Sequence, residues 1–149
     1  MKDRKIIMGI DTSNYTTSVA LMYSDGELIA NIKEPLPVKL GECGLRQSDA
    51  VFAHIKNLPK AMEKASGILN GRSVSAIGVS ERPRNVFGSY MPCFLAGLSA
   101  ATSAAAASGV PLYRFSHRVC RYTGFRISAD ILWRQYILQM RIRFLKVPF

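Results

Sequence analysis

A carboxylate and a run of hydroxyl side chains lie close together near the start of the chain. Asp11 follows a short apolar run, and the residues from Thr12 to Thr17 are polar and suited to a tight connection. In such a loop, backbone N–H groups and hydroxyls can hold a phosphate, while a carboxylate holds a hydrated divalent cation. The segment therefore indicates a phosphate site. An ordinary β-hairpin with a polar tip is the simpler alternative.

Strands should flank this loop, because short apolar runs rich in β-branched residues lie on both sides of it. These runs cover residues 5–10 and 17–23. A third strand is expected over 27–35, after the turn signal Ser24-Asp25-Gly26. Three successive antiparallel strands thus open the predicted domain.

A long helix is predicted next, with Ser48 as its N-cap and Gly71 as its stop. Pro59 lies inside this pattern, so we expect a kink or a break near it. Apolar residues at steps of three and four form a stripe that should face the core, and they are Val51, Ile55, Leu58, Met62, Ala65 and Leu69.

The remaining elements alternate between strand and helix. A buried strand is predicted over 73–80, a helix from about Tyr90 to Ser108 with Ser89 as its cap, and a strand over 111–115. The order β-β-β-α-β-α-β predicts an α/β fold with a mixed sheet flanked by helices.

Composition narrows the class of protein. A chain of 149 residues that is 48% hydrophobic and 20% charged is typical of one globular domain. The three cysteines follow neither a metal-ligand nor a disulfide pattern, and no segment is apolar enough to span a bilayer. We therefore expect a cytoplasmic protein without a membrane partner. Walker and Rossmann nucleotide motifs and the HExxH protease motif are absent from the sequence.

The positive charge is spread unevenly. The whole chain carries +10, of which residues 118–149 contribute seven basic side chains against one acidic side chain. The same segment holds six of the fourteen aromatic residues and has little amphipathic order. We therefore divide the chain into an amino-terminal domain, residues 1–117, and an atypical basic tail, residues 118–149.

Four sequence blocks carry a resemblance to a known family. They are GIDTSNYTTSVAL, GLRQSDAVFAHI, SERPR followed by GSYMPCFLAGLSAA, and VPLYRFSH, in that order. They resemble the TsaD-like tRNA threonylcarbamoyladenosine transferases, formerly O-sialoglycoprotein endopeptidases, and most closely a divergent Gram-positive branch. The resemblance implies the actin-like ATPase fold of sugar kinases and the heat-shock chaperone, in which two ribonuclease-H-like halves close on a nucleotide. It covers residues 5–117, so a truncated fold with one such half is expected.

The resemblance also implies site residues. Asp11 falls at the family's first acidic position and is the expected catalytic group. Asn14, Tyr15 and Thr16 stand where the family has Cys-Asp-Glu, which removes two acidic groups. By the same alignment, the expected nucleotide-binding residues are Thr12, Ser13, Asn14, Thr16 and Thr17.

Two further sets follow from the same resemblance. His117 matches the first histidine of the family's HxxxH metal motif, but Arg121 stands at the second position and cannot bind a metal. On residues alone, His117 also reads as an ordinary surface or core histidine. The expected cleft and substrate residues are His54, Arg82, Arg84, Gly88 and Ser89.

The implied function is transfer of threonylcarbamoyl from an adenylate to tRNA adenosine, with this chain incomplete and inactive as it stands. The implied cofactors are a divalent metal (iron or zinc) and an adenine nucleotide or threonylcarbamoyl-adenylate. The implied partners are tRNA and the other subunits of threonylcarbamoyladenosine synthesis. The alternative is a non-catalytic paralogue that dimerises with the transferase.

The tail admits two hypotheses. Back-translation of residues 132–137, read one base later, spells Ser-Gly-Gly-Ser-Thr, which resembles the family's next phosphate loop. On the first hypothesis, residues 118–149 are out of frame. On the second, they form a basic helix that lies on RNA or anionic lipid.

Overall fold

The computed structural model describes residues 4–13, 15–38 and 44–117, and the whole predicted tail lies outside this part. The predicted succession of elements is confirmed. In chain order they are β1 (Ile6–Asp11), β2 (Thr16–Tyr23), β3 (Leu28–Pro35), α1 (Gln47–Leu69), β4 (Ala76–Arg82), α2 (Cys93–Ser108) and β5 (Leu112–Ser116).

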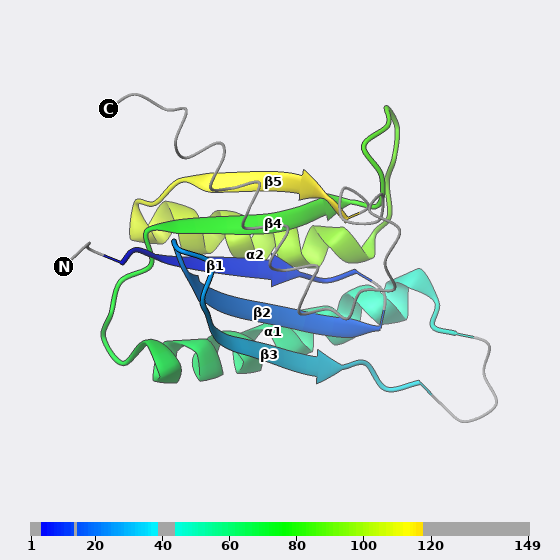
Figure 1. The fold of residues 1–149 in the computed structure, drawn as a ribbon. Helices are drawn as coiled ribbons and strands as arrows, with labels where there is room; N and C mark the ends of the chain where they lie inside the picture. Colours follow the sequence, from blue (N-terminus) through cyan, green and yellow to red (C-terminus); the bar gives the residue numbers. More distant parts are fainter. Residues whose placement is uncertain (1–3, 14, 39–43, 118–149) are drawn as a thin grey trace.

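The five strands form one mixed sheet in the order β3-β2-β1-β4-β5 (Figure 1). The pairs β1–β2 and β2–β3 are antiparallel, whereas β1–β4 and β4–β5 are parallel. The two crossovers α1 and α2 make the parallel pairs possible, because a parallel neighbour needs a long return connection. The predicted α/β fold with a mixed sheet is therefore confirmed.

Both helices pack on the same side of the sheet (Figure 1). Alternate residues of β1 point to that side, and Ile6, Met8 and Ile10 enter the main core with residues of both helices. The other face of the sheet carries a smaller apolar cluster, and no described helix packs on that face. Its buried residues are Ile7, Ala20, Met22, Ala76 and Phe115.

The apolar stripe predicted for α1 is partly wrong, because the helix is rotated about its axis. Ile55 was expected in the core but is 53% exposed, and the helix buries Ala50, His54 and Ala61 in addition to Leu58 and Ala65. Small alanine side chains let the helix approach the sheet closely. The larger side chains of the stripe are displaced toward α2, where Val51, Ile55 and Met62 line a groove.

Both helix starts also differ from prediction. The first helical residue of α1 is Gln47, so Ser48 lies inside the helix and is not its N-cap. The predicted break is wrong, because α1 continues through Pro59. The second helix starts at Cys93, after Pro92, since the residue before a proline is disfavoured in helical conformation. None of the described helices has the length and apolar content that a membrane span would need.

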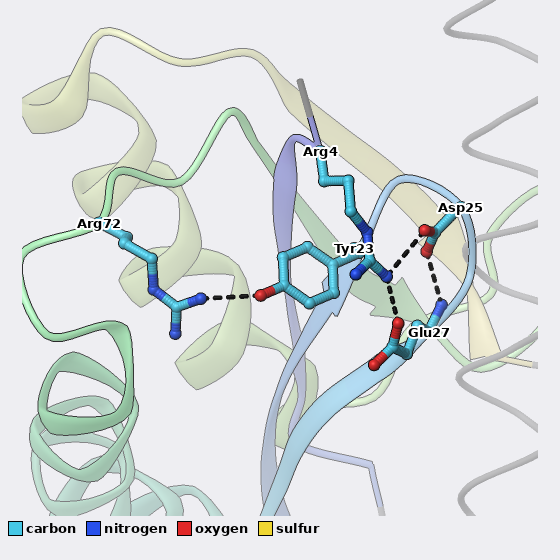
Figure 2. A network of polar contacts seen from close by, with 5 residues as sticks. All are labelled: Arg4, Tyr23, Asp25, Glu27 and Arg72. Carbon is cyan, nitrogen blue, oxygen red and sulfur yellow. Dashed lines mark hydrogen bonds and ion pairs between the residues drawn. The ribbon is translucent and has the colours of Figure 1, made fainter. Parts of the chain in front are cut away.

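A polar network closes the end of the sheet opposite to Asp11 (Figure 2). The Arg4 guanidinium lies 3.9 Å from the centre of the Tyr23 ring and forms ion pairs with Asp25 and Glu27 of the β2–β3 turn. On the other side of the ring, Arg72 donates a hydrogen bond of 2.8 Å to the Tyr23 hydroxyl. The network joins the start of β1, the β2–β3 turn and the end of α1.

The edge strand β3 is attached to α1 by the Glu34 carboxylate and by hydrogen bonds from Asn57 to the backbone oxygens of Glu34 and Pro35. Glu34 is 7% exposed and accepts hydrogen bonds from Lys60 and Lys64. These two ammonium groups lower the pKa of the Glu34 carboxyl from its ordinary value. The carboxylate therefore stays charged at neutral pH, and it fixes how α1 crosses the edge of the sheet.

The end of β1 is attached to α2 by Thr12. Its hydroxyl, which has no exposed surface, donates to the backbone oxygen of Cys93 at 2.8 Å and accepts from the backbone N–H of Gly97 at 3.1 Å. A Cβ atom on Gly97 would lie 2.7 Å from the same hydroxyl oxygen. The absence of a side chain at Gly97 therefore allows α2 to lie against the loop that follows β1.

We expect the substitution Gly97→Ala to destabilise the protein by about 1–3 kcal/mol, because the added methyl group overpacks against Thr12. Gly67→Ala is the matched control, since Gly67 is also helical but has nothing within 4 Å of an added Cβ atom. That control should be neutral or stabilising by up to about 1 kcal/mol. Urea unfolding measures both. Equal effects of the two substitutions would contradict the close approach at Thr12.

Candidate functional site

A polar cluster lies at the carboxyl end of the sheet, on the face without a described helix. Side chains alternate along a strand, so Asp11 shares this face with Ile7, and Ser80 shares it with Ala76. The parallel pairing of Ile10 with Val79 brings the ends of β1 and β4 together. His117 directly follows β5 and completes the cluster.

The Asp11 carboxylate is the centre of this cluster. Its Oδ1 atom accepts hydrogen bonds from the backbone N–H of Ser13, at 3.1 Å, and from the Ser80 hydroxyl. Its Oδ2 atom accepts from the Ser13 hydroxyl at 2.7 Å and lies 3.5 Å from Nδ1 of His117. The side chains of Asp11 and His117 remain 21% and 34% exposed, so a ligand can reach both.

These contacts determine the charge of the carboxylate. Burial by itself would raise the pKa of Asp11, but hydrogen bonding to His117, the charge of His117 and the hydroxyls of Ser80 and Ser13 hold that pKa below its ordinary value of 3.8. Asp11 is therefore ionised at neutral pH. An ionised, partly exposed carboxylate between hydroxyl groups can hold a hydrated divalent cation.

The ring of His117 is also supported from the helix side. It lies 6.1 Å from the ring of Phe94, centre to centre, with the two planes tilted by 60°. Phe94 is 2% exposed and belongs to the first turn of α2. The helix α2, which is hydrogen-bonded to Thr12, thus also positions the imidazole of His117 beside Asp11.

The iron or zinc site implied by the resemblance is not complete among the described residues. One imidazole and one carboxylate are too few ligands for a stable zinc or iron centre, which needs at least three protein ligands. No group of three histidine, cysteine, aspartate or glutamate side chains with suitable geometry occurs in residues 4–13, 15–38 and 44–117. One imidazole and one carboxylate therefore fit a hydrated cation better than a bound zinc or iron ion.

Three predicted site residues lie on the opposite, helix-covered side of the sheet. Thr12 contacts α2 as described above, and the Thr17 hydroxyl lies 2.8 Å from Nδ1 of His54 on α1. All three side chains have no exposed surface. In this arrangement they contact protein atoms, and their contact with nucleotide or substrate stays a prediction.

The remaining nucleotide-binding predictions have different outcomes. Ser13 joins the cluster and is 8% exposed. Thr16 begins β2 and pairs with Pro35 of the edge strand. Asn14 lies outside the described residues.

The predicted cleft residues on the β4–α2 loop mainly shape that loop. Arg82 pairs with Glu81 and donates to Oδ1 of Asn85 at 3.0 Å. The Ser89 hydroxyl accepts from the backbone N–H of Arg84 at 3.0 Å. Gly88 has φ 74°, a left-handed conformation that glycine adopts without strain. Their contact with substrate stays a prediction.

Reasoning from the sequence missed two features of the site. Ser80 was recognised only as a strand end, although a predicted parallel pairing of β1 and β4 would have indicated its approach to Asp11. The attachment of Thr12 to Cys93 and Gly97 had no local signal, since it joins residues more than 80 positions apart.

We expect the pKa of the Asp11 carboxyl to rise in the variants His117→Gln and Ser80→Ala, because each removes a partner that favours the ionised form. Carboxyl ¹³C NMR during an acid titration measures this pKa. Ser66→Ala, an exposed serine change on α1, is the control and should leave the Asp11 titration unchanged.

The lowered pKa of Asp11 determines how the stability of the fold changes with pH. Ionised Asp11 stabilises the fold fully above the pKa of the unfolded chain, and this contribution is lost as the pH falls through the lower folded value. The stability difference between wild type and Asp11→Asn should therefore shrink as the pH is lowered from 7 toward 3. A difference that stays constant over this range would contradict the assignment.

Comparison with solved structures finds proteins whose fold is similar to that of this chain. No protein-family model matches the chain, and no curated protein matches its sequence. Among solved structures, YeaZ from Pseudomonas aeruginosa is similar with a TM-score of 0.50 and 17% identity over 78% of this chain. RuvC from T. thermophilus in complex with a Holliday junction substrate is similar with a TM-score of 0.52 and 11% identity, over 95% of this chain and 96% of that one.

The chain spans about half the length of YeaZ, since the match covers 47% of that protein. At these identities the likeness concerns the fold. The chain has a five-stranded mixed sheet with two helices on one face, and its fold is similar to those of YeaZ and RuvC. It is a ribonuclease-H-like α/β fold, as the sequence resemblance led us to expect.

Proposed function

We propose that this chain acts in tRNA threonylcarbamoyladenosine synthesis and that the cluster around Asp11 holds the cation and phosphate of an adenine nucleotide or threonylcarbamoyl-adenylate. The observation that carries the proposal is the ionised Asp11 carboxylate at the carboxyl ends of adjacent strands, where α/β sheets bind ligands. The fold likeness to YeaZ and the sequence resemblance over residues 5–117 support it.

In this proposal each side chain of the cluster has a separate task. Asp11 would hold a hydrated cation, which would offset the negative charge of the nucleotide phosphates when both are bound. The hydroxyls of Ser13 and Ser80 keep the carboxylate oriented, while the partly exposed imidazole of His117 can donate to a phosphate oxygen. A transition metal would supply Lewis-acid polarisation, but no task is assigned to it because its ligands are incomplete here.

Transfer to tRNA would need more than the described residues. The chain spans about half of YeaZ, and the described residues correspond to one half of the implied actin-like fold. We therefore propose nucleotide binding as the activity of this chain. The carbamoyl transfer itself would belong to an assembly with partner subunits.

A nuclease role is less well supported, although RuvC shares the fold. Cleavage of a phosphodiester by two metal ions needs ligands for both ions. Among the described residues the cluster offers Asp11 as its one carboxylate, with hydroxyls and an imidazole beside it.

Calorimetric titration of the full chain with ATP and Mg²⁺, and with a non-hydrolysable threonylcarbamoyl-adenylate analogue, tests the proposal. We expect binding that depends on Mg²⁺ and that becomes at least tenfold weaker in Asp11→Asn, since about 1.4 kcal/mol is tenfold in affinity. The control Asp49→Asn removes an exposed carboxylate from the first turn of α1 and should bind as wild type does.

The outcome that contradicts the proposal is equally specific. A wild-type chain that binds neither compound, or an Asp11→Asn variant with unchanged affinity, would exclude the cluster as the nucleotide site.

A non-catalytic partner of a transferase is the second candidate, and a groove between the two helices favours it. The groove has a volume of about 540 Å³, and two of its side chains, Ile55 and Leu95, are 53% and 48% exposed. Exposed apolar surface of this kind marks interaction sites. Its lining residues are Val51, Ile55, Leu58, Pro59, Met62, Leu95, Ala96, Ser99 and Ala100.

Leu95→Glu should abolish co-elution of this chain with a complete threonylcarbamoyl transferase in size-exclusion chromatography, because it places a charge in the groove. Ile68→Glu is the matched control, since Ile68 is 39% exposed on α1 but does not line the groove. If wild type does not co-elute, or if both variants lose the partner equally, the groove is not the docking surface.

A further inference from the structure

The loop between β4 and α2 exposes an unusual amount of apolar surface. Within five residues, Val86 is 58% exposed, Tyr90 is 66% exposed, and Phe87 is fully exposed. Of all large apolar side chains in the described residues, Phe87 is the most exposed. An aromatic ring that gains nothing from the core is best explained by a partner that covers it.

Internal hydrogen bonds hold the loop in shape. The backbone N–H of Ser89 donates to the Val86 oxygen at 3.2 Å, and the Ser89 hydroxyl accepts from the backbone N–H of Arg84 at 3.0 Å. Gly88 turns the chain with φ 74°. Phe87 therefore lies on a turn that is already held by hydrogen bonds. This order lowers the conformational entropy lost when a partner binds.

The charge of the loop selects the kind of partner. Residues 82–92 contain no acidic side chain, and the charge of Glu81 is balanced by Arg82. Arg82 is thus already paired. The Arg84 guanidinium has no hydrogen bond or ion pair among the described residues, so its cation can bind an external anion.

The position of the loop places these groups beside the functional cluster. The loop projects beyond the carboxyl ends of β4 and β5 (Figure 1), at the end of the sheet where Asp11 and His117 meet. It encloses an open hollow of about 390 Å³ lined by Arg82, Asn85, Val86, Phe87, Gly88 and Ser89. This volume is near the lower limit of the roughly 300–1,000 Å³ typical of ligand pockets.

We propose that this loop binds unpaired RNA, with Phe87 stacking on a base and Arg84 binding a phosphate. A base offers a planar face to an aromatic ring, and a phosphate accepts the forked donors of arginine. The aspartate and glutamate side chains of an acidic peptide offer no such face, and a membrane surface would need several cations that are not already paired within the loop. The inference rests on the proposed function for the choice of RNA as the polymer.

Fluorescence anisotropy tests the inference with the full chain, a short labelled RNA hairpin with an unpaired loop, and the same RNA as a full duplex. We expect the hairpin to bind more tightly than the duplex. Phe87→Ala should weaken hairpin binding about tenfold, whereas Phe87→Trp should retain it, because stacking is lost only in the first. Arg84→Gln should weaken binding and lower the salt-dependence slope by about one.

Matched controls distinguish the effect of the loop residues from the effect of losing any cation or any exposed aromatic ring. Phe52→Ala removes another exposed aromatic ring, on α1, and Arg72→Gln removes one cation at the opposite end of the sheet. Both should bind the hairpin as wild type does. Nucleotide binding by Phe87→Ala is measured in parallel and should equal that of wild type, which distinguishes a failure of the nucleotide site from a failure of the loop.

Three outcomes would overturn the inference. They are wild-type chain that does not bind the hairpin, Phe87→Ala with unchanged affinity, and control variants that lose as much affinity as the loop variants. Competition by poly-glutamate as strong as competition by unlabelled hairpin would also overturn it, since it would indicate a contact by charge alone.

Discussion

The Asp11 carboxylate is the group on which the arrangement of the site depends. It is held by the backbone and hydroxyl of Ser13, by the Ser80 hydroxyl and by His117, which come from three different segments of the chain. Because these groups favour the charged form, they overcome the effect of burial and keep the pKa of Asp11 low. The ends of β1, β4 and β5 are thus joined around one negative charge that a ligand can still reach.

The sheet separates this charge from the groups that hold the scaffold together. On the helix side, Thr12 attaches the end of β1 to α2, and Thr17 contacts His54 on α1. On the other face, Asp11 and His117 remain partly exposed. Alternation along the strands therefore lets one short polar segment serve both purposes, since neighbouring side chains point to opposite faces.

The order of elements and the fold class could be predicted from the sequence, because apolar runs, turn residues and helical spacing are local signals. The rotation of α1 could not, since Val51 and Ile55 satisfy the same spacing as Ala50 and His54, and close packing of small alanines decided between them. Asp11 and His117 were found as separate candidates. The contact between Asp11 and His117, and the hydrogen bond from Ser80 to Asp11, depend on the parallel pairing of strands that are distant in sequence.

The central claim is that a cation and a phosphate bind beside Asp11, and paramagnetic NMR tests it most directly. Mn²⁺ added with ATP broadens the signals of nearby nuclei. The account predicts broadening at Ser13, Ser80 and His117, with little effect at Arg72 at the other end of the sheet, and loss of the effect in Asp11→Asn. Broadening centred elsewhere, or unchanged in that variant, would contradict the account.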